Sequence, residues 1–500
     1  MQGWEYLILD IGTTGIKIFL LDEKGDILFT YRKRVSTYHP HPSYWEQRGE
    51  EILEQVKRVI QKGLEKASQK KKIYFGLTNQ RSTSLIWDQR GKPLTPAITW
   101  QDGRTLSFAS RLNQRFWVHG WQRILKGLTH LFSFLGLPRG IPICEKIRQL
   151  VRFSFHTSLS AVHLAYWLQK LPVSSQPLCW GTLDSWILFH LSSKKLHITD
   201  PTHASATGLY DLFKGEWSPL LLKILKIPPS ILPKIVEPGA PLGKWQLFQR
   251  EVEAFGPIAD QQASFLGLGP LEEGKLKCTM GTGFFWNLCT GRKVLGSDNG
   301  LVPMVAYQKG EHTWYLLEGM ATSGGSLLDW AIQAGILSSY EEIDELKINY
   351  PQNAIPEVMI PAFSGLFAPQ WAPQAKPLWL GFSAKTRKKE WIQSLLEVFG
   401  FQGRDILSAM RKEWGGISQQ AWVDGGCAQS DQILQIMADL TGIIMIRPQK
   451  LFATALGVAR IIAEQKGLEF PKIEGESYFY PRSDSRFRKK YEKKWLIGLQ

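Results

Sequence analysis

Short apolar runs and glycine turns alternate at the start of the chain. The first run, residues 6–9, ends at Asp10, and a second run follows at residues 16–21 after the turn Gly12-Thr13-Thr14-Gly15. A third run lies near residues 27–31, beyond another turn. Apolar runs of this length, joined by tight turns, are typical of antiparallel strands. The pattern therefore predicts a three-stranded meander.

The same pattern returns about 270 residues later. Residues 276–279 lead into Gly281-Thr282-Gly283, and residues 284–289 are apolar again. A glycine turn after a strand lets backbone N–H groups approach a phosphate. Two such units indicate a duplicated architecture with one phosphate-type turn in each half.

Between and after these units, strands alternate with helices. Helical spacing of apolar residues and buried apolar runs predict helices at 50–66, 391–409 and 430–440 and strands at 73–77, 84–88 and 421–423. This alternation favours an α/β fold in two halves. A Pro- and Gly-rich stretch at 227–243 precedes the second half. We therefore expect an N-terminal domain over 1–250 and a C-terminal domain over 251–500.

Composition narrows the class of protein. The chain has 500 residues, more than one core usually organises, and its 44% of hydrophobic residues is too high for a disordered protein. No apolar run is long enough for a membrane span, and Glu5 and Asp10 do not fit a secretory signal. The five cysteines show no metal-binding spacing, so we expect a reduced, cytoplasmic setting. The net charge of +15 favours anionic partners such as nucleotides.

Asp10 and the turn after it are candidates for binding a metal and a phosphate. A strand-ending carboxylate suits a hydrated Mg²⁺, which takes only one or two protein oxygens. Gly12 opens the backbone to phosphate oxygens, and the hydroxyls of Thr13 and Thr14 add donors. Lys17 adds a positive charge near the same turn. The alternative is an ordinary hairpin with a capping aspartate.

Two later glycine turns are weaker signals. Gly281-Thr282-Gly283 gains meaning only as the second copy of the first turn, which makes it a second candidate phosphate clamp. Asp424-Gly425-Gly426 follows a strand and precedes a helix. Paired glycines there let a base or a ribose lie against the backbone, near a helix N-terminus. Each turn has a purely structural alternative.

Candidate acceptor-binding residues follow two other strands. Asp260 and Gln261 come after the apolar residues 258–259, and a carboxylate there can take a proton from a substrate hydroxyl. The alternative is a helix N-cap, where Asp is common. Arg81 follows a buried strand, and Trp100 lies downstream. Together they suit a polyhydroxy ligand, although Arg81 has a structural alternative.

Eight blocks of the chain, taken in order, are similar to those of the FGGY carbohydrate kinases, with the glycerol kinases nearest. The blocks are DIGTTGIK, GLTNQRSTSLIWDQRGKPLTPAITWQDGRT, GTLDSWILFHL, HITDPTHASATGLYDL, IADQQASFLG, MGTGFFWNLCTG, IPAFSGLFAPQWAPQA and WVDGGCAQSDQILQIMADLTG. They span about Tyr6 to about Ala463. The resemblance implies the α/β actin-like ATPase fold, two ribonuclease H-like domains with a central cleft. It also implies an ATP- and Mg²⁺-dependent kinase of a small polyol or sugar.

The resemblance implies roles for the matching residues. Asp10 would hold the Mg²⁺ water shell, and Asp260 would be the general base on the attacking hydroxyl. The residues that would contact ATP are Gly12, Thr13, Thr14, Lys17, Gly281, Thr282, Gly283, Gly325, Gly425 and Gly426. Within this set Thr13, Thr14 and Lys17 would face the γ-phosphate, and Gly325 and Gly426 the adenosine. The residues that would contact the acceptor are Arg81, Ser82, Trp100, Asp260, Gln261 and Phe285.

Three positions depart from the glycerol kinases. Ser82 stands where those enzymes read Glu, Ser158 where they have a pocket Tyr, and Ser430 where an Asn follows the adenosine-site glycines. Smaller side chains widen a pocket, so a larger polyol or a ketose is an alternative acceptor. Residues 100–104 resemble part of the xylulokinase pattern, but the GQMHG block of those enzymes is absent. The second alternative is a catalytically weak member acting as a binding or regulatory protein.

Residues 111–155 match no block of the family. This basic insert carries eight Lys or Arg residues, interleaved with aromatic residues, and one acid, Glu145. Such a stretch can lie on anionic lipid or on a partner. We prefer a helical cap over the substrate side, with its charges in solvent. No recognised motif predicts nucleic-acid binding, and a homodimer stays open.

Overall fold

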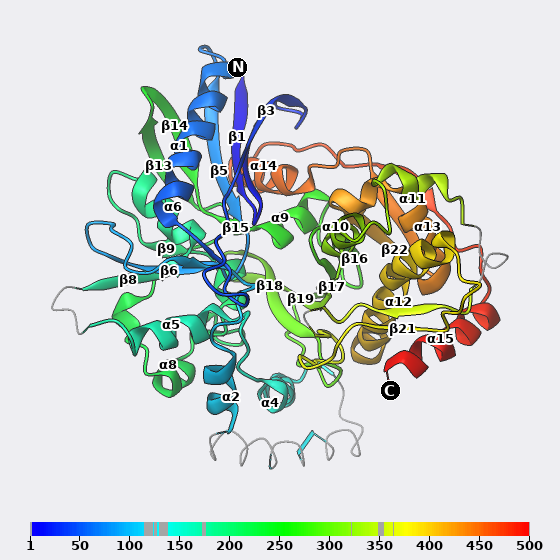
Figure 1. The fold of residues 1–500 in the computed structure, drawn as a ribbon. Coiled ribbons are helices and arrows are strands. Elements are labelled where there is room, and N and C mark those ends of the chain that lie inside the picture. The colour runs from blue at the N-terminus through cyan, green and yellow to red at the C-terminus, as the bar shows by residue number, and fades with distance from the viewer. Residues whose placement is uncertain are drawn as a thin grey trace. The chain divides into compact units, whose positions relative to one another are not determined.

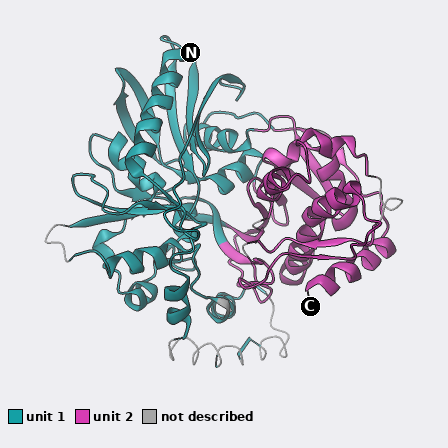
Figure 2. Ribbon diagram, in the orientation of Figure 1, with its two compact units in different colours: residues 1–270, 304–314, 452–472 teal, residues 271–303, 315–451, 473–500 magenta. Residues whose placement is uncertain are grey.

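The computed structural model describes residues 3–114, 124, 128–129, 139–172, 177–321, 323–348, 355–363 and 365–499. The chain divides into two compact units (Figure 2). Unit 1 comprises residues 1–270, 304–314 and 452–472. Unit 2 comprises residues 271–303, 315–451 and 473–500. Each unit is therefore assembled from segments that lie far apart in the sequence.

A seven-stranded sheet forms the core of unit 1 (Figure 1). Its strands are β1 (Trp4–Ile11), β2 (Gly15–Leu21), β3 (Ile27–Arg34), β5 (Lys72–Asn79), β13 (Pro241–Leu247), β14 (Arg250–Phe255) and β15 (Ile258–Ala259). Their order is β13-β14-β5-β1-β2-β3, with β15 paired to β5. β1, β2 and β3 pair antiparallel, whereas β1, β14 and β15 run parallel to β5. The predicted meander is confirmed.

Helices cover both faces of this sheet. α1 (Gly49–Lys66) packs on the face of Leu7, where Gly63 of the helix leaves room for that side chain. α14 (Ala453–Gln465) packs on the face of Ile8, where Val458 lies over Gly76 of β5. Because successive side chains of a strand point to opposite faces, Leu7 and Ile8 place the two helices on opposite sides.

Unit 1 also contains a smaller sheet, two strand pairs and further helices. The smaller sheet has the order β4-β7-β6-β8 and consists of β4 (Glu46–Gln47), β6 (Ser84–Asp88), β7 (Ala97–Ile98) and β8 (Leu178–Thr182). The strand pairs are β9 (Ile198–Thr199) with β12 (Lys234–Ile235), and β10 (Tyr210–Asp211) with β11 (Glu216–Trp217). The helices are α2 (Leu106–Gln114), α4 (Pro142–Arg152), α5 (Ser160–Leu168), α6 (Leu183–Leu191), α7 (Pro201–Ala206), α8 (Pro219–Leu225), the 3₁₀ helix η1 (Pro229–Ile231) and α9 (Asp260–Gly267).

A second seven-stranded sheet repeats the plan of the first. Its strands are β16 (Leu276–Met280), β17 (Phe284–Gly291), β18 (Val302–Lys309), β19 (His312–Ala321), β22 (Gln420–Asp424), β23 (Ile444–Pro448) and β24 (Gly475–Phe479), in the order β18-β19-β17-β16-β22-β23-β24. β16 pairs antiparallel with β17 and parallel with β22, as β1 does with β2 and β5. This repetition is the duplicated architecture that the two glycine-turn units predicted.

The remaining elements of unit 2 are mostly helical. They are α10 (Gly325–Gln333), α11 (Glu341–Glu345), α12 (Lys388–Trp414), the 3₁₀ helix η2 (Gly426–Gln429), α13 (Asp431–Thr441), α15 (Ser485–Leu499) and the strand pair β20 (Val358–Ile360) and β21 (Leu378–Leu380). α12 is longer at both ends than the helix predicted at 391–409. At its start Glu390 accepts from the backbone N–H of Arg387 at 2.9 Å. The polar first and last turns of α12 lack the apolar spacing used for the prediction. Phe399 of α12 stacks on Phe284 in the core.

Candidate active site

Two carboxylates lie at the same edge of the first sheet. Asp10 pairs in register with Thr78, near the carboxyl end of β5. On the other side of β5, Ala259, the residue directly before Asp260, pairs with Asn79. The carboxyl ends of parallel strands meet at one edge of a sheet, where ligands of α/β proteins bind. Burial raises the pKa of Asp10 to about 6, an effect that Lys17 opposes and the Asp260 carboxylate increases. Asp10 and Asp260 therefore interact electrostatically.

The turn after Asp10 is tied to other predicted site residues. Thr13 Oγ1 donates to Gln80 Oε1 at 2.6 Å and accepts from Trp100 Nε1 at 3.2 Å. Gln47 Nε2 donates to the Thr13 carbonyl at 2.8 Å. The exposed Thr14 hydroxyl accepts from Arg32. The structure thus brings Trp100 against the phosphate-type turn, and it adds Gln47, which sequence reasoning missed because no motif marks it.

Asp260 is the first residue of α9, and Ala259 occupies the N-cap position. Asp260 Oδ1 accepts from the backbone N–H of Gln261 at 2.8 Å. α9 crosses α14 at very short range, because a Cβ at Gly267 or at Gly457 would overlap the backbone of the other helix. This glycine contact fixes the helix on which Asp260 lies.

The predicted acceptor residues Arg81 and Ser82 follow β5. Arg81 Nη1 lies 2.8 Å from Met304 Sδ. Ser82 has a positive φ of 62° and donates its hydroxyl to the Ala206 carbonyl at 3.2 Å. Its side chain is therefore used inside the fold of unit 1.

Ser158 stands where the resemblance places a pocket Tyr. Its Oγ lies 2.6 Å from His156 Nδ1. Burial lowers the pKa of His156 to about 4, so this imidazole is neutral at pH 7. Ser158 and His156 thus form a short, uncharged contact.

In unit 2, the turn Gly281-Thr282-Gly283 packs on the start of α10. Gly281 N donates to the Gly283 carbonyl at 2.9 Å, which closes the turn. Gly325 N donates to the Gly281 carbonyl at 2.8 Å, and a Cβ at Gly325 would lie 2.9 Å from that oxygen. Thr282 is exposed, and Phe285, on β17, is half-buried. The structure thus brings the turn Gly281-Thr282-Gly283 and Gly325 together.

The Asp424-Gly425-Gly426 turn lies against the end of β16 at Met280. Gly425 has a φ of 93°, and a Cβ there would overlap the Met280 carbonyl, whereas a Cβ at Gly426 would meet open space. η2 begins at Gly426 of this turn and leads to α13. Ser430 is the N-cap of α13 and donates to Asp344 Oδ1 at 2.7 Å. Its hydroxyl is therefore engaged in capping.

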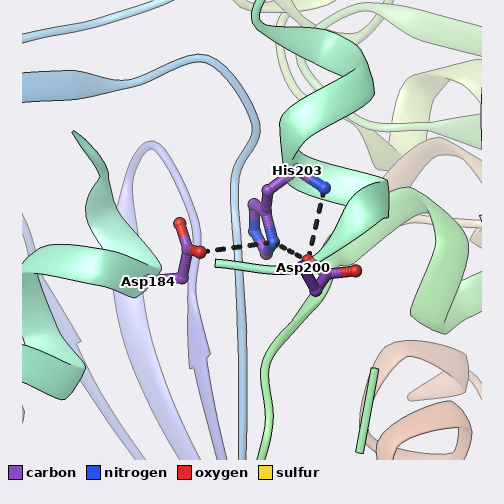
Figure 3. A group of neighbouring side chains, drawn as sticks. All are labelled: Asp184, Asp200 and His203. Carbon is purple, nitrogen blue, oxygen red and sulfur yellow. Dashed lines mark hydrogen bonds and ion pairs between the residues drawn. The ribbon is translucent and has the colours of Figure 1, made fainter. Parts of the chain in front are cut away.

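A buried charged cluster lies in unit 1 (Figure 3). Asp184, Asp200 and His203 are each 0% exposed, and the His203 ring lies between the two carboxylates. His203 Nδ1 lies 2.5 Å from Asp200 Oδ1 and 3.7 Å from Asp184 Oδ2. Sequence reasoning missed this cluster, although Asp200-Pro201 is an N-cap followed by a proline, a typical helix start.

The cluster does not suit a metal ion. Thr199 Oγ1 donates to Asp184 at 2.6 Å, Thr182 Oγ1 donates to its other oxygen, and Asp200 accepts from the backbone and hydroxyl of Thr202. Each carboxylate oxygen thus already has a donor, and His203 Nδ1 is bound to Asp200. A cation would have to break these bonds, so we interpret the cluster as a buried ion-pair network.

The network should make the free energy of unfolding depend on pH. Burial lowers the pKa of His203, but Asp184, Asp200 and Asp260 outweigh burial and raise it to about 9. Native His203 then holds its proton more tightly than the unfolded chain does, so its contribution is complete below about pH 6.5 and is lost as the pH rises to about 9. Urea unfolding should show this decline in the wild type and less of it in His203→Gln. If the free energy of unfolding falls equally steeply with pH in both proteins, the interpretation is wrong.

Part of the basic insert is described. Glu145 is fully buried, and its Oε1 lies 2.8 Å from Arg148 Nη1 and 3.0 Å from Arg139 Nε. These two cations are therefore paired within unit 1. Residues 115–123, 125–127 and 130–138 of the insert lie outside the described residues, so lipid or partner contact there stays a prediction. Across the described ranges, every helix is too short or too polar to cross a membrane.

Comparison with known proteins places this chain in a family. The model of the FGGY family of carbohydrate kinases matches with its N-terminal domain at residues 5–134 and 142–256 and with its C-terminal domain at 276–463. Of the basic insert only residues 135–141 lie outside this match, so the expectation that residues 111–155 have no counterpart in the family is wrong for the rest of the segment. The glycerol kinase of Alkalilimnicola ehrlichii is 32% identical over 484 residues, 95% of this chain and 92% of that enzyme.

Solved structures agree on the fold. Plasmodium falciparum glycerol kinase with ADP has a TM-score of 0.85 at 24% identity, covering 99% of this chain and 98% of that one. The ligand-bound xylulose kinase of Lactobacillus acidophilus has a TM-score of 0.81 at 20% identity, covering 99% and 96%. The predicted two-domain α/β, actin-like ATPase fold is confirmed. The chain belongs to the FGGY carbohydrate kinases, ATP-using phosphotransferases that have an alcohol group as acceptor.

Proposed function

We propose that this chain transfers the γ-phosphate of ATP to a hydroxyl of a small polyol or sugar, with Asp260 as the general base. The observation that carries the proposal is the pair of carboxylates at one edge of the first sheet. Asp10 and Asp260 flank the end of β5 and interact electrostatically. One carboxylate can then serve a metal and the other a hydroxyl.

The acceptor side is assigned to Asp260. Its carboxylate takes the proton of the acceptor hydroxyl while the acceptor oxygen bonds to Pγ and the bond from Pγ to the β-phosphate oxygen breaks. Gln261 contacts the acceptor beside it. In phosphoryl transfer most of the protein's contribution is positioning and charge stabilisation, which suits a base held on a tightly packed helix.

The nucleotide side is assigned to the glycine turns. Thr13, Thr14 and Lys17 contact the γ-phosphate, with Gly12 keeping the backbone open. Gly281, Thr282 and Gly283 hold the ATP phosphates through backbone N–H groups. The open space at Gly426 supports an adenosine contact there, with Gly325 and Gly425 shaping the surrounding backbone.

Asp10 is the residue that would hold Mg²⁺. The donor set fits, since a half-buried carboxylate that lies near a second carboxylate gains from a divalent cation, and Mg²⁺ binds through one or two such oxygens. When bound, the ion would offset the negative charge of the phosphates.

The acceptor is proposed to be larger than glycerol. Ser82 replaces the Glu of the glycerol kinases, and its hydroxyl bonds to Ala206 instead of being available to a ligand. Ser158 is likewise engaged with His156. Arg81, Trp100 and Phe285 stay assigned to the acceptor. The small side chains at positions 82 and 158 should leave more room for a four- to seven-carbon polyol or a ketose and fewer partners for glycerol.

A panel of acceptors tests this assignment. One lost hydrogen bond to a charged partner costs about 1.5–3 kcal/mol, or roughly one to two decades in affinity. We therefore expect a glycerol KM about 10- to 100-fold above that of a kinase with Glu at this position. Coupled ADP release should be measured with glycerol, erythritol, ribitol, xylulose, ribulose and sedoheptulose. Tight, efficient use of glycerol alone would show that the pocket argument is wrong.

A variant at Ser82 sharpens the test. Ser82→Glu restores the carboxylate and should lower the glycerol KM by a similar factor, whereas Ser82→Ala, which loses only the bond to Ala206, should not. The rival function is a binding or regulatory protein with little catalysis. Bound ATP without turnover on any acceptor would favour that rival.

A further inference from the structure

The short helix α7 lies against the strand that leads into Asp260. Thr202 in its first turn accepts a hydrogen bond from Ala259 N, the residue before Asp260, at 2.8 Å. The same hydroxyl donates to Asp200 Oδ2 at 2.6 Å. Thr202 and Ala259 are both 0% exposed, so water cannot replace either bond. The backbone position of the proposed base is thereby tied to Asp200.

Both carboxylate oxygens of Asp200 accept hydrogen bonds. It accepts from the backbone of Thr202 and His203 and from the His203 ring, whose other neighbour is Asp184. Asp184 in turn accepts from Thr182 and Thr199. The chain of bonds therefore runs from α6 through His203 and Asp200 to Thr202 and ends at the residue before Asp260.

Two further bonds fix the far end of α7. Ser82 Oγ donates to the Ala206 carbonyl at 3.2 Å, and Ser205 Oγ accepts from Val305 N at 3.3 Å. The Val305 carbonyl accepts from Gln262 Nε2 of α9 at 3.1 Å. α7 thus connects the segment after β5 with both the entry to α9 and its first turn.

We propose that Thr202, supported by the buried network of Asp184, Asp200 and His203, is a positioning residue that sets the place of the Asp260 carboxylate. The proposal rests on the proposed role of Asp260 as general base. Thr202 acts through the Ala259 backbone and does not touch the substrate. A base that is displaced by about 1 Å can lose about 10²-fold in rate, so removal of the Thr202 hydroxyl should change turnover more than binding.

Thr202→Val tests the proposal, because valine keeps the shape of the side chain and removes only the hydroxyl. We expect kcat to fall about 10- to 100-fold, with the KM for ATP unchanged, and Thr202→Ser to retain nearly full kcat. Thermal unfolding is measured alongside. Thr207→Val is the matched control, since Thr207 is also buried and its hydroxyl donates to Ala204 and accepts from Leu209 N. The kcat of Thr207→Val should stay at the wild-type value, even though this variant loses as many hydrogen bonds as Thr202→Val does.

A kcat for Thr202→Val no lower than that for Thr207→Val would overturn the proposal. If the valine variant does not fold, Thr202→Cys and Thr207→Cys give the same comparison, because a thiol is only a weak donor and acceptor. Failure of the proposed function has a separate signature: Asp260→Asn would then keep its turnover. An inactive Asp260→Asn enzyme together with a normal Thr202→Val enzyme removes the positioning role alone.

Discussion

Replacing Asp260 with asparagine is expected to lower kcat by about 10²–10⁴-fold, the usual contribution of a general base. Asparagine keeps the size of the side chain and cannot accept the hydroxyl proton. ATP affinity should stay nearly unchanged, because the base acts on the acceptor and not on the nucleotide. Steady-state ADP release measures the first effect, and titration calorimetry with ATP measures the second.

Asp88→Asn is the matched control for this variant. Asp88 also ends a strand of unit 1, but its carboxylate accepts only from its own turn, at Arg90 N and Lys92 N, among the bonds the structure gives it. Its loss should leave kcat as it is in the wild type. If Asp260→Asn turns over as fast as the wild type on the true acceptor, Asp260 is not the base.

Asp10→Ala is expected to have the second-largest effect. A bound metal ion would be the largest local charge on the phosphates. Loss of the group proposed to hold its water shell should therefore cut turnover by about 10²–10³-fold, as loss of other charge-stabilising groups does. The Mg²⁺ concentration for half-maximal rate should rise at the same time. Magnesium titrations of ADP release at saturating ATP measure both quantities.

Asp22→Ala provides the comparison for Asp10→Ala. Asp22 caps the turn after β2 and accepts from Lys24 N and Asp26 N, so its loss should change neither rate nor Mg²⁺ dependence. An unchanged Mg²⁺ requirement in Asp10→Ala would remove Asp10 from the metal site.

Local patterns were sufficient to predict much of the fold. Residues 6–9 and 16–21 are apolar runs around a glycine turn, and such a hairpin depends on neighbours in sequence. The repeat at Gly281-Thr282-Gly283 extended the prediction to the second half. The fold of the whole chain and its reaction class came from resemblance to a family.

Other features depend on contacts between distant segments. The bond between Thr202 and Ala259 joins residues whose places are set only when β15 pairs with β5, and no local pattern signals it. No local pattern signals, either, that residues 304–314 and 452–472 belong to unit 1. Ser82 illustrates the limit within the candidate site: the sequence shows a missing carboxylate, but only the structure shows its hydroxyl on Ala206.

The most direct test of the proposed reaction is the stoichiometry of its products. The chain should be incubated with ATP, Mg²⁺ and the best acceptor of the panel, and ADP, free phosphate and phosphorylated acceptor should be quantified by ³¹P NMR. Transfer to an acceptor hydroxyl predicts equal amounts of ADP and phosphorylated acceptor, with little free phosphate. ADP accompanied by free phosphate, with no phosphorylated acceptor, would contradict it.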